Sequence, residues 1–183
     1  MDQNSIIKGC KQGQEKAFKA LVDQYAPKLM AVCIRYLKDT DPAKDALQES
    51  LISIFKAIGT YAGTGSFEGW MKKITVRVSL RELRNIRYLY ELTVVDQQEM
   101  MGYNDQFTFE TEDILKLIDE LPEIQRVVFN MYVVEGFNHA EISDLLNIQE
   151  SSSRVYLTRA RKLLQDSIEK SNKRENLILR NKT

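Results

Sequence analysis

The spacing of apolar residues constrains the fold most, because it repeats with the period of an α-helix along almost the whole chain. Within residues 44–58, apolar residues recur every three or four positions, at Leu47, Leu51, Ile54, Phe55 and Ile58. Further stripes of this period are formed by Phe18, Leu21, Val22, Tyr25 and Leu29, and by Val32, Tyr36 and Leu37. Three prolines and eight glycines also leave little room for a sheet with many tight turns. The sequence therefore predicts an all-α fold.

Length and composition limit the class of protein further. A chain of 183 residues holds one large or two small domains. No apolar run reaches the roughly 20 residues of a membrane-spanning helix, and the N-terminus MDQNSIIKGC lacks the pattern of a signal peptide. Cys10, Cys33 and His139 are too few for a disulfide framework or for a zinc site without carboxylate ligands. We therefore expect a reduced, cytoplasmic protein that binds no metal and no cofactor.

The sequence also argues against an enzyme. Its one histidine lies at a predicted helix start, and it has no recognisable nucleophile–base pair or glycine-rich phosphate loop. The carboxylates lie mainly on the polar faces of predicted helices. We therefore expect no catalytic residues and no small-molecule substrate.

Charge is segregated along a chain whose formal net charge is zero. Residues 71–90 hold six basic residues and one acid, whereas residues 91–125 hold ten acids and one lysine. Residues 150–164 are basic again, with four basic residues and one acid. Basic segments on both sides of an acidic one indicate a nucleic-acid partner, although the overall charge does not.

The loss of helical period between residues 89 and 110 marks a boundary in the chain. This segment is acidic and includes Gly102, Asn104 and Asp105, and order resumes at Thr111, which has the pattern of a helix N-cap. The predicted organisation is therefore two small helical domains joined by an acidic linker. The predicted parts are a first domain at 1–90, a linker at 91–110, a second domain at 111–170 and a frayed polar tail at 171–183.

The helix predicted over residues 67–88 has one apolar and one cationic face. Met71, Ile74 and Val78 are spaced to pack inward. The cationic face consists of Lys73, Arg77, Arg81 and Arg84, with Trp70 above them. Neighbouring cations on a helix repel each other by about 0.2–0.5 kcal/mol per pair. A helix built only for stability would interleave acids, so this cationic stripe indicates that an anionic partner docks there.

Residues 138–164 have the pattern of a helix-turn-helix. Asn138 and Glu141 resemble a capping box that begins a short helix, and Asn147 can end that helix in the left-handed conformation. A second helix follows within three or four residues, which is the tight connection that this motif needs.

The second helix of this motif presents polar and basic side chains on the side away from the first. Its inner side consists of Leu157, Ala160 and Leu164. Small polar groups near the N-terminus and bases further along suit a helix that enters the major groove of DNA. The outward residues are Ser151, Val155, Thr158, Arg159 and Lys162, with Ser152 and Arg154 on the flanks and Arg161 as a further base along the helix.

Together these segments resemble the extracytoplasmic-function (ECF) sigma factors of bacterial RNA polymerase over nearly the whole chain. Residues 45–49, DALQE, followed by Phe55, are similar to the D-x-x-Q-E helix of sigma region 2. Residues 67–74, FEGWMKKI, with Arg84, are similar to the promoter-melting segment of that region. Residues 121–164 are similar to sigma region 4.

This resemblance implies three binding surfaces. Core RNA polymerase would be bound by Asp45, Gln48, Glu49 and Phe55. The minus-ten element would be bound and opened by the loop at 59–66 and by Trp70, Lys73, Arg77, Arg81 and Arg84, while Phe67 and Trp70 fit either the core or base contacts. The outward residues of the second helix-turn-helix helix would read the minus-thirty-five element.

The resemblance also implies the partners and the compartment. Partners would be core RNA polymerase, promoter DNA and an anti-sigma factor, often membrane-bound, in the bacterial cytoplasm. The acidic linker would pass through the nucleic-acid channel of the polymerase, where its charge resembles that of a polynucleotide.

The chain departs from the family pattern at several positions. Thr75, Arg77 and Arg81 stand where the family usually has alanine, asparagine and often aspartate, which bears on minus-ten recognition. Asn147 replaces the usual glycine of the turn, and Ser153 replaces a valine early in the second helix. Two alternatives stay open: a sigma-like protein that binds partners without initiating transcription, and another helix-turn-helix regulator.

Overall fold

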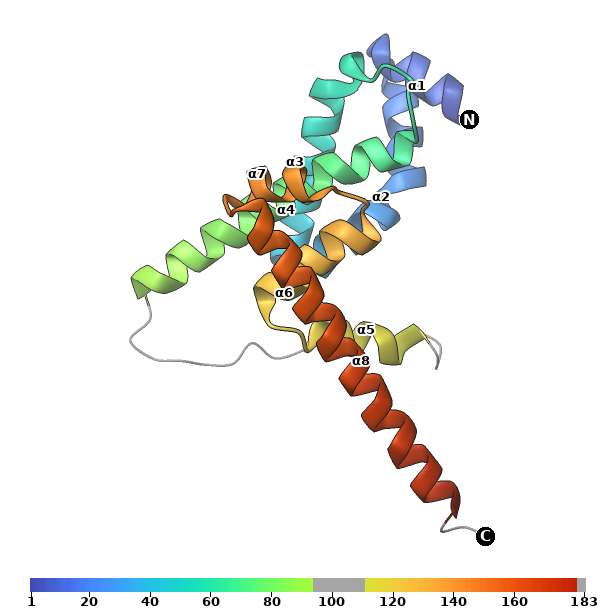
Figure 1. The fold of residues 1–183 in the computed structure, drawn as a ribbon. Helices are drawn as coiled ribbons and strands as arrows, with labels where there is room; N and C mark the ends of the chain where they lie inside the picture. Colours follow the sequence, from blue (N-terminus) through green and yellow to red (C-terminus); the bar gives the residue numbers. More distant parts are fainter. Residues whose placement is uncertain (94–110, 181–183) are drawn as a thin grey trace. The chain divides into compact units, whose positions relative to one another are not determined.

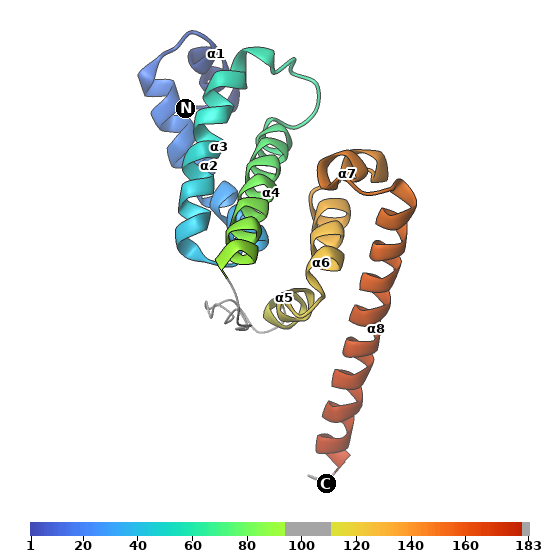
Figure 2. The same cartoon turned by 90° about the vertical axis from the view of Figure 1, so that its left-hand side faces the viewer.

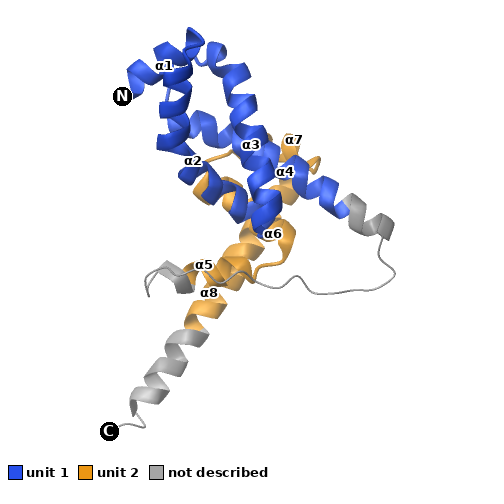
Figure 3. Cartoon of the chain, turned by 180° about the vertical axis from the view of Figure 1, so that it is seen from behind, with its two compact units in different colours: residues 1–104 blue, residues 105–183 orange. Residues whose placement is uncertain are grey.

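The computed structural model describes residues 1–93 and 111–180, with side chains described for residues 1–87 and 114–169 (Figure 1). All regular elements in these residues are helical, which confirms the predicted all-α class. The chain divides into two compact units, residues 1–104 and 105–183 (Figure 3). The predicted acidic linker lies outside the described residues from residue 94 onward.

Unit 1 is a bundle of helices that are close together in sequence. Its elements are α1 (Gln3–Lys11), α2 (Glu15–Leu37), α3 (Thr40–Ala57), a 3-10 turn (Ile58–Thr60) and α4 (Phe67–Thr93). Helices α2, α3 and α4 pack against one another, and α1 packs on α2 (Figure 2). Since α4 continues to Thr93, the helix passes the predicted domain boundary at residue 90.

Local sequence signals account for the ends of these helices. The Asp2 side chain accepts a hydrogen bond from the backbone of Ser5 at the start of α1, and Asp39 caps α3 in the same way. Lys38 adopts the left-handed conformation (φ 61°) that ends α2. Pro27 lies inside α2, where it removes one backbone donor.

The core of unit 1 differs in detail from the predicted stripe on α3. The fully buried side of α3 consists of small residues and one isoleucine: Ala43, Ala46, Ser50 and Ile54. Leu47, Leu51 and Phe55, which were predicted to be core residues, are only half-buried and pack against its edge. Small side chains allow α2, α3 and α4 to approach closely, and the larger ones are left at the rim.

Unit 2 contains the helix-turn-helix. Its elements are α5 (Thr111–Asp119), α6 (Glu123–Phe129), a π-helical turn η2 (Asn130–Val134), α7 (His139–Leu146) and α8 (Glu150–Arg180). The helical segment that begins with α6 therefore ends in a π turn, and Gly136 follows at a positive φ of 73°. The backbone of α8 stays helical over residues 171–180, where the sequence suggested a frayed tail.

The core of unit 2 is formed around α6, η2 and the two helices of the helix-turn-helix. Its most buried side chains are Val128, Met131, Phe137, Ile142 and Ala160. Near α5 the burial is uneven: Leu121, just after its end, is buried, but Ile114 within it is 53% exposed. Within the described residues, no helix is both long and apolar enough to span a membrane, and no cluster of side chains suits a metal ion.

Candidate nucleic-acid and protein interfaces

The residues predicted to bind polymerase lie together on α3. Asp45 and Gln48 are exposed, and Glu49, one turn from Asp45, is half-exposed. Phe55 is half-buried, because its ring packs edge-on against Phe18 with 4.3 Å between ring centroids. This face of α3 therefore offers two carboxylates and an amide to a partner, with an aromatic ring at its apolar edge.

The cationic stripe of α4 faces solvent, as its spacing predicted. Arg77, Arg81 and Arg84 are exposed, and Lys73 is half-buried. On the opposite side, Met71 and Val78 are buried. Thr75, which replaces the usual alanine, is also buried, and its hydroxyl donates to the Met71 carbonyl at 3.1 Å.

One ion pair joins the two predicted surfaces of unit 1. Arg81 on α4 lies 3.5 Å from the Glu49 carboxylate on α3, and both side chains are about half exposed. An exposed pair of this kind contributes about 0–1 kcal/mol to stability. The sequence did not indicate that Glu49, assigned to polymerase, and Arg81, assigned to DNA, would contact each other.

An aromatic cluster supports the start of α4 and the loop before it. Phe67 is fully buried and contacts Tyr25, Tyr61 and Trp70 at centroid distances of 5.8, 5.1 and 5.8 Å. Trp70 stacks on Phe67 but remains half-buried, so the two residues differ in their access to a partner. Phe67 therefore belongs to the core, whereas part of Trp70 remains accessible to solvent.

Polar contacts fix the loop at 59–66 against this cluster. The Tyr61 hydroxyl donates to the Gly65 carbonyl at 2.9 Å, and Lys11 donates to the Tyr61 carbonyl at 2.8 Å. Gly63 and Gly65 both have a φ of 78°, which glycine adopts without strain.

A second set of charges lies in the first turn of α4, where Glu68 pairs with Lys28 at 2.6 Å and with Lys72 at 3.0 Å. The hydrogen bond from Lys28, followed by that from Lys72, lowers the pKa of Glu68. Both contacts favour the ionised carboxylate.

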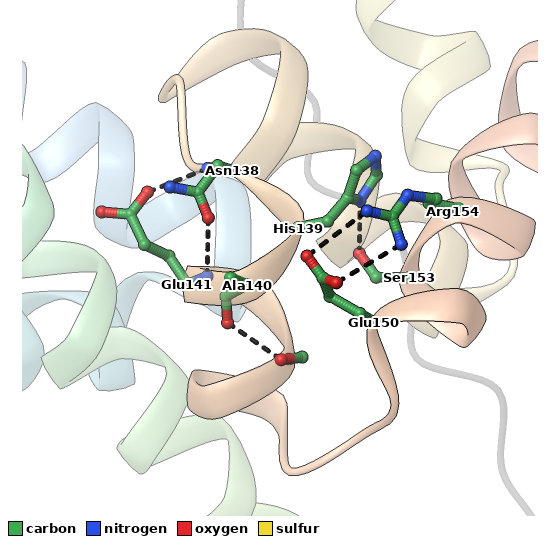
Figure 4. A network of polar contacts seen from close by, with 8 residues as sticks. Asn138, His139, Ala140, Glu141, Glu150, Ser153 and Arg154 are labelled. Atoms are coloured by element: carbon green, nitrogen blue, oxygen red, sulfur yellow. Dashed lines mark hydrogen bonds and ion pairs between the residues drawn. The ribbon is translucent and has the colours of Figure 1, made fainter.

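The helix-turn-helix begins with the capping box that the sequence indicated (Figure 4). The Asn138 side chain accepts from the Glu141 backbone at 2.9 Å, and the Glu141 carboxylate accepts from the Asn138 backbone at 2.9 Å. Asn147 ends α7 in the left-handed conformation (φ 53°, ψ 49°), and α8 begins at Glu150. These predictions are confirmed.

The outward residues of α8 lie where the helical projection put them. Ser152 is half-buried, and the other predicted residues are exposed: Ser151, Arg154, Val155, Thr158, Arg159, Arg161 and Lys162. Arg154 is held by Glu150 through two contacts of 3.4 Å between their forked ends (Figure 4). The exposed face therefore combines small polar groups, one apolar valine and several cations.

Sequence reasoning missed several contacts behind this face. Ser153, which replaces the usual valine, is fully buried, and its hydroxyl lies 2.9 Å from Nδ1 of His139. The His139 ring stacks on Tyr132 with 4.5 Å between ring centroids, and Arg161 lies over the Tyr132 ring at 5.8 Å from its centroid. No spacing rule relates residues 132, 139 and 153, so the sequence held no signal for this contact.

Comparison with known protein families agrees with the two helical units described above. Two family models match the chain: Sigma-70 region 2 over residues 21–87 and Sigma-70, region 4 over residues 111–164. The first match lies in unit 1 and the second in unit 2.

Similar proteins extend over nearly the whole chain. The ECF RNA polymerase sigma-E factor of Haemophilus influenzae is 24% identical, with 92% of this chain and 96% of that protein covered. The RNA polymerase sigma-H factor of Pseudomonas aeruginosa is 23% identical, with 90% of this chain and 92% of that protein covered.

Solved structures share the fold. The sigma factor RpoE of Bartonella quintana, in complex with the anti-sigma factor NepR, gives a TM-score of 0.58 at 18% identity, with 84% of this chain and 98% of that chain covered. CnrH, in complex with the cytosolic domain of CnrY, gives a TM-score of 0.51 at 16% identity, with 90% of this chain and 95% of that chain covered. From the two family matches and the relatives that span the chain, this protein belongs to the ECF sigma factors, which direct RNA polymerase to promoters and initiate transcription.

Proposed function

We propose that the two units divide the work of a sigma factor. Residues 1–90 act as region 2, which binds core polymerase and the minus-ten element, and residues 111–170 act as region 4, which binds the minus-thirty-five element. The acidic segment at 91–110 passes through the nucleic-acid channel of the polymerase. The observation that carries this proposal is that α4 and α8 each expose several arginines while Met71, Val78, Leu157 and Ala160 on the same helices are buried.

Core polymerase docks on the exposed face of α3. Asp45, Gln48 and Glu49 present carboxylates and an amide on one side of the helix, and this suits a basic, helical partner such as the clamp coiled coil of the large polymerase subunit. Phe55 adds an apolar contact at the edge of this face.

The minus-ten element meets the stripe on α4 and the loop at 59–66. The arginines contact phosphates, and Trp70 offers a ring on which an unpaired base can stack, an interaction worth about 1–3 kcal/mol. Arg77→Ala with Arg84→Ala should lower the slope of log affinity against log salt by about 0.9 for each phosphate that the variant no longer neutralises. An unchanged slope and affinity would show that the stripe does not face DNA.

The experiment that tests polymerase docking reverses the charge of its face. Asp45→Lys with Glu49→Lys should abolish holoenzyme assembly with core RNA polymerase, measured by co-migration, while helicity stays unchanged. Glu15→Lys with Asp23→Lys on α2 is the matched control, because both acids are exposed and the change in net charge is equal. Undiminished assembly of the α3 variant would remove this face from the interface.

Run-off transcription separates an initiating sigma factor from a sigma-like protein that only binds partners. Genomic fragments that the reconstituted holoenzyme selects serve as templates. We expect transcripts that depend on the added chain; their absence from all bound fragments would favour the non-initiating alternative.

An anti-sigma factor is a further proposed partner. The two structural neighbours described above were each solved with one, NepR and the cytosolic domain of CnrY. A membrane-bound anti-sigma factor with a cytosolic domain would hold this chain in the bacterial cytoplasm, away from polymerase. Its docking would cover the half-buried apolar edge of α3, where Leu47, Leu51 and Phe55 are partly exposed.

A further inference from the structure

Near its N-terminus, α8 makes a partly buried polar contact with α7, beside the apolar packing of Leu157 and Ala160. Ser153 is 0% exposed, although its neighbour Arg154 is exposed on the proposed DNA face. Its hydroxyl lies 2.9 Å from His139 Nδ1, at the start of α7 (Figure 4). Buried hydroxyls need a partner, so this contact specifies how α8 is rotated about its axis.

His139 is itself held from the other side. Its ring stacks on Tyr132 of η2 with an interplanar angle of 26°, and the Tyr132 ring also lies beneath Arg161 of α8. The contacts therefore run from η2 through the histidine to Ser153 and return to α8 further along the helix. Two attachment points fix the direction of a helix. A single attachment point would leave the helix free to pivot.

Burial, together with the neighbouring arginines, favours a neutral His139 ring. Partial burial lowers its pKa, Arg154 and Arg161 lower it further, and Glu150 opposes them. With a neutral ring, Ser153 either donates to Nδ1 or accepts from Nδ1–H, depending on the tautomer.

We propose that His139 is a positioning residue for promoter reading: through Ser153 it sets the rotation of α8 and thereby the aim of Ser151, Ser152 and Arg154 at base edges. This proposal rests on the proposed role of α8 in reading the minus-thirty-five element. Base-edge hydrogen bonds require a fixed geometry, whereas cations reach phosphates from many positions. Removing the hydrogen bond therefore weakens sequence discrimination more than affinity for DNA in general.

The chain offers a matched pair of substitutions at this position. His139→Phe keeps a ring to stack on Tyr132 but removes Nδ1. His139→Asn removes the ring but keeps a polar atom near the place of Nδ1. Ser153→Ala removes the hydroxyl from the other side, and Ser143→Ala is the control, because the hydroxyl of that half-buried serine donates to the Ala140 carbonyl of its own helix.

The test uses holoenzyme and a pool of double-stranded DNA randomised over about one helical turn at the upstream element. We measure the sequences enriched by each variant and the ratio of affinities for the most enriched and a scrambled sequence. His139→Phe and Ser153→Ala should lower this ratio about two- to tenfold, the range of one net hydrogen bond. Affinity for the scrambled sequence should stay within about twofold, as expected when phosphate contacts remain.

The remaining variants decide between positioning and mere stability. His139→Asn and Ser143→Ala should keep the wild-type ratio, and the double variant His139→Phe with Ser153→Ala should lose no more than either single one. Equal loss of both affinities, or a wild-type ratio in His139→Phe and Ser153→Ala, would overturn the proposal. If wild-type holoenzyme enriches no upstream sequence, the proposed reading by α8 fails instead, and the positioning role fails with it.

Discussion

Regions 2 and 4 of this sigma factor are stabilised in different ways. Region 2 surrounds Phe67 with other aromatic rings, and its three long helices close over small side chains. Region 4 depends on a capping box and on the contact between His139 and Ser153 at the points where its helices meet. Apolar packing is not directional, whereas hydrogen bonds are. Both regions therefore have an apolar core, and region 4 adds directional contacts where α7 and α8 meet.

The exposed surfaces of the two regions also differ. Helix α4 carries its cations in line, which suits contacts to a phosphate backbone. Helix α8 places serines and the paired Arg154 near its N-terminus, and Lys162 further along. The comparison predicts that region 2 contributes mostly affinity and region 4 mostly sequence preference.

The largest effect should come from the aromatic core. Phe67→Ala removes a fully buried ring and should destabilise region 2 by about 3–5 kcal/mol. Hydrogen exchange should show faster opening of α2, α3 and α4 amides. Phe137→Ala, at an equally buried phenylalanine of unit 2, should instead affect the amides of α6 and α7. Loss of protection in both regions from either substitution would contradict the separation of the two cores.

A smaller effect concerns base reading by α8. Arg154→Ala should lower the discrimination between correct and incorrect bases at one promoter position by about 1–3 kcal/mol. Arg159→Ala should have the same effect at another promoter position. Lys162→Ala should weaken binding equally for all sequences. Affinities measured over single-base variants of a selected promoter decide this. The reverse outcome, with Lys162 controlling preference, would mean that α8 lies in the groove in another orientation.

The capping box of region 4 should have a still smaller effect. Asn138→Ala removes the acceptor for the Glu141 backbone and should lower the stability of region 4 by about 1 kcal/mol. This change is measured by unfolding the protein with denaturant and following the backbone amides of region 4 separately from those of region 2. Asn138→Ser should restore most of the stability, since serine is an equally good cap; if it does not, the side chain acts through something other than capping.

Much of this structure was predictable because local signals determined it. The helical stripes indicated the fold class, Asn138 and Glu141 indicated the start of α7, and Asn147 indicated its end. The projection of α8 also placed its exposed residues correctly. Each of these features depends on residues within about two helical turns of one another, which is the range that sequence patterns report.

Features that depend on tertiary packing were not predictable. From the sequence, Phe67 and Trp70 fitted the core equally well. The positions of Tyr25 and Tyr61 bury Phe67 and leave Trp70 half-exposed. The pairing of Arg81 with Glu49 requires the packing of α3 on α4. The π turn at 130–134 arises from one extra residue in a turn, which an apolar period does not distinguish.

The smallest effect is a difference in pH response between the regions. The folded state lowers the pKa of His139 below the usual 6.5, first by burial and then through Arg154, so the unfolded chain binds the proton more readily. The stability that the neutral ring contributes is complete above the usual pKa and is lost as the pH falls from that value through the lower pKa of the folded state. Glu68 of region 2 has a pKa below its usual 4.5, so its contribution is lost only in more acidic solution.

Region 4 should therefore lose stability between about pH 7.5 and about pH 5.5, where histidine is the side chain that ordinarily titrates, and region 2 should not. The chain has one histidine, so His139→Asn should abolish this dependence. Amide exchange of α7 and α8 against that of α2 and α3, measured at both pH values, provides the comparison. An equal response in the two regions, or an undiminished response in His139→Asn, would show that the neutral ring does not contribute to the packing of α7 on α8.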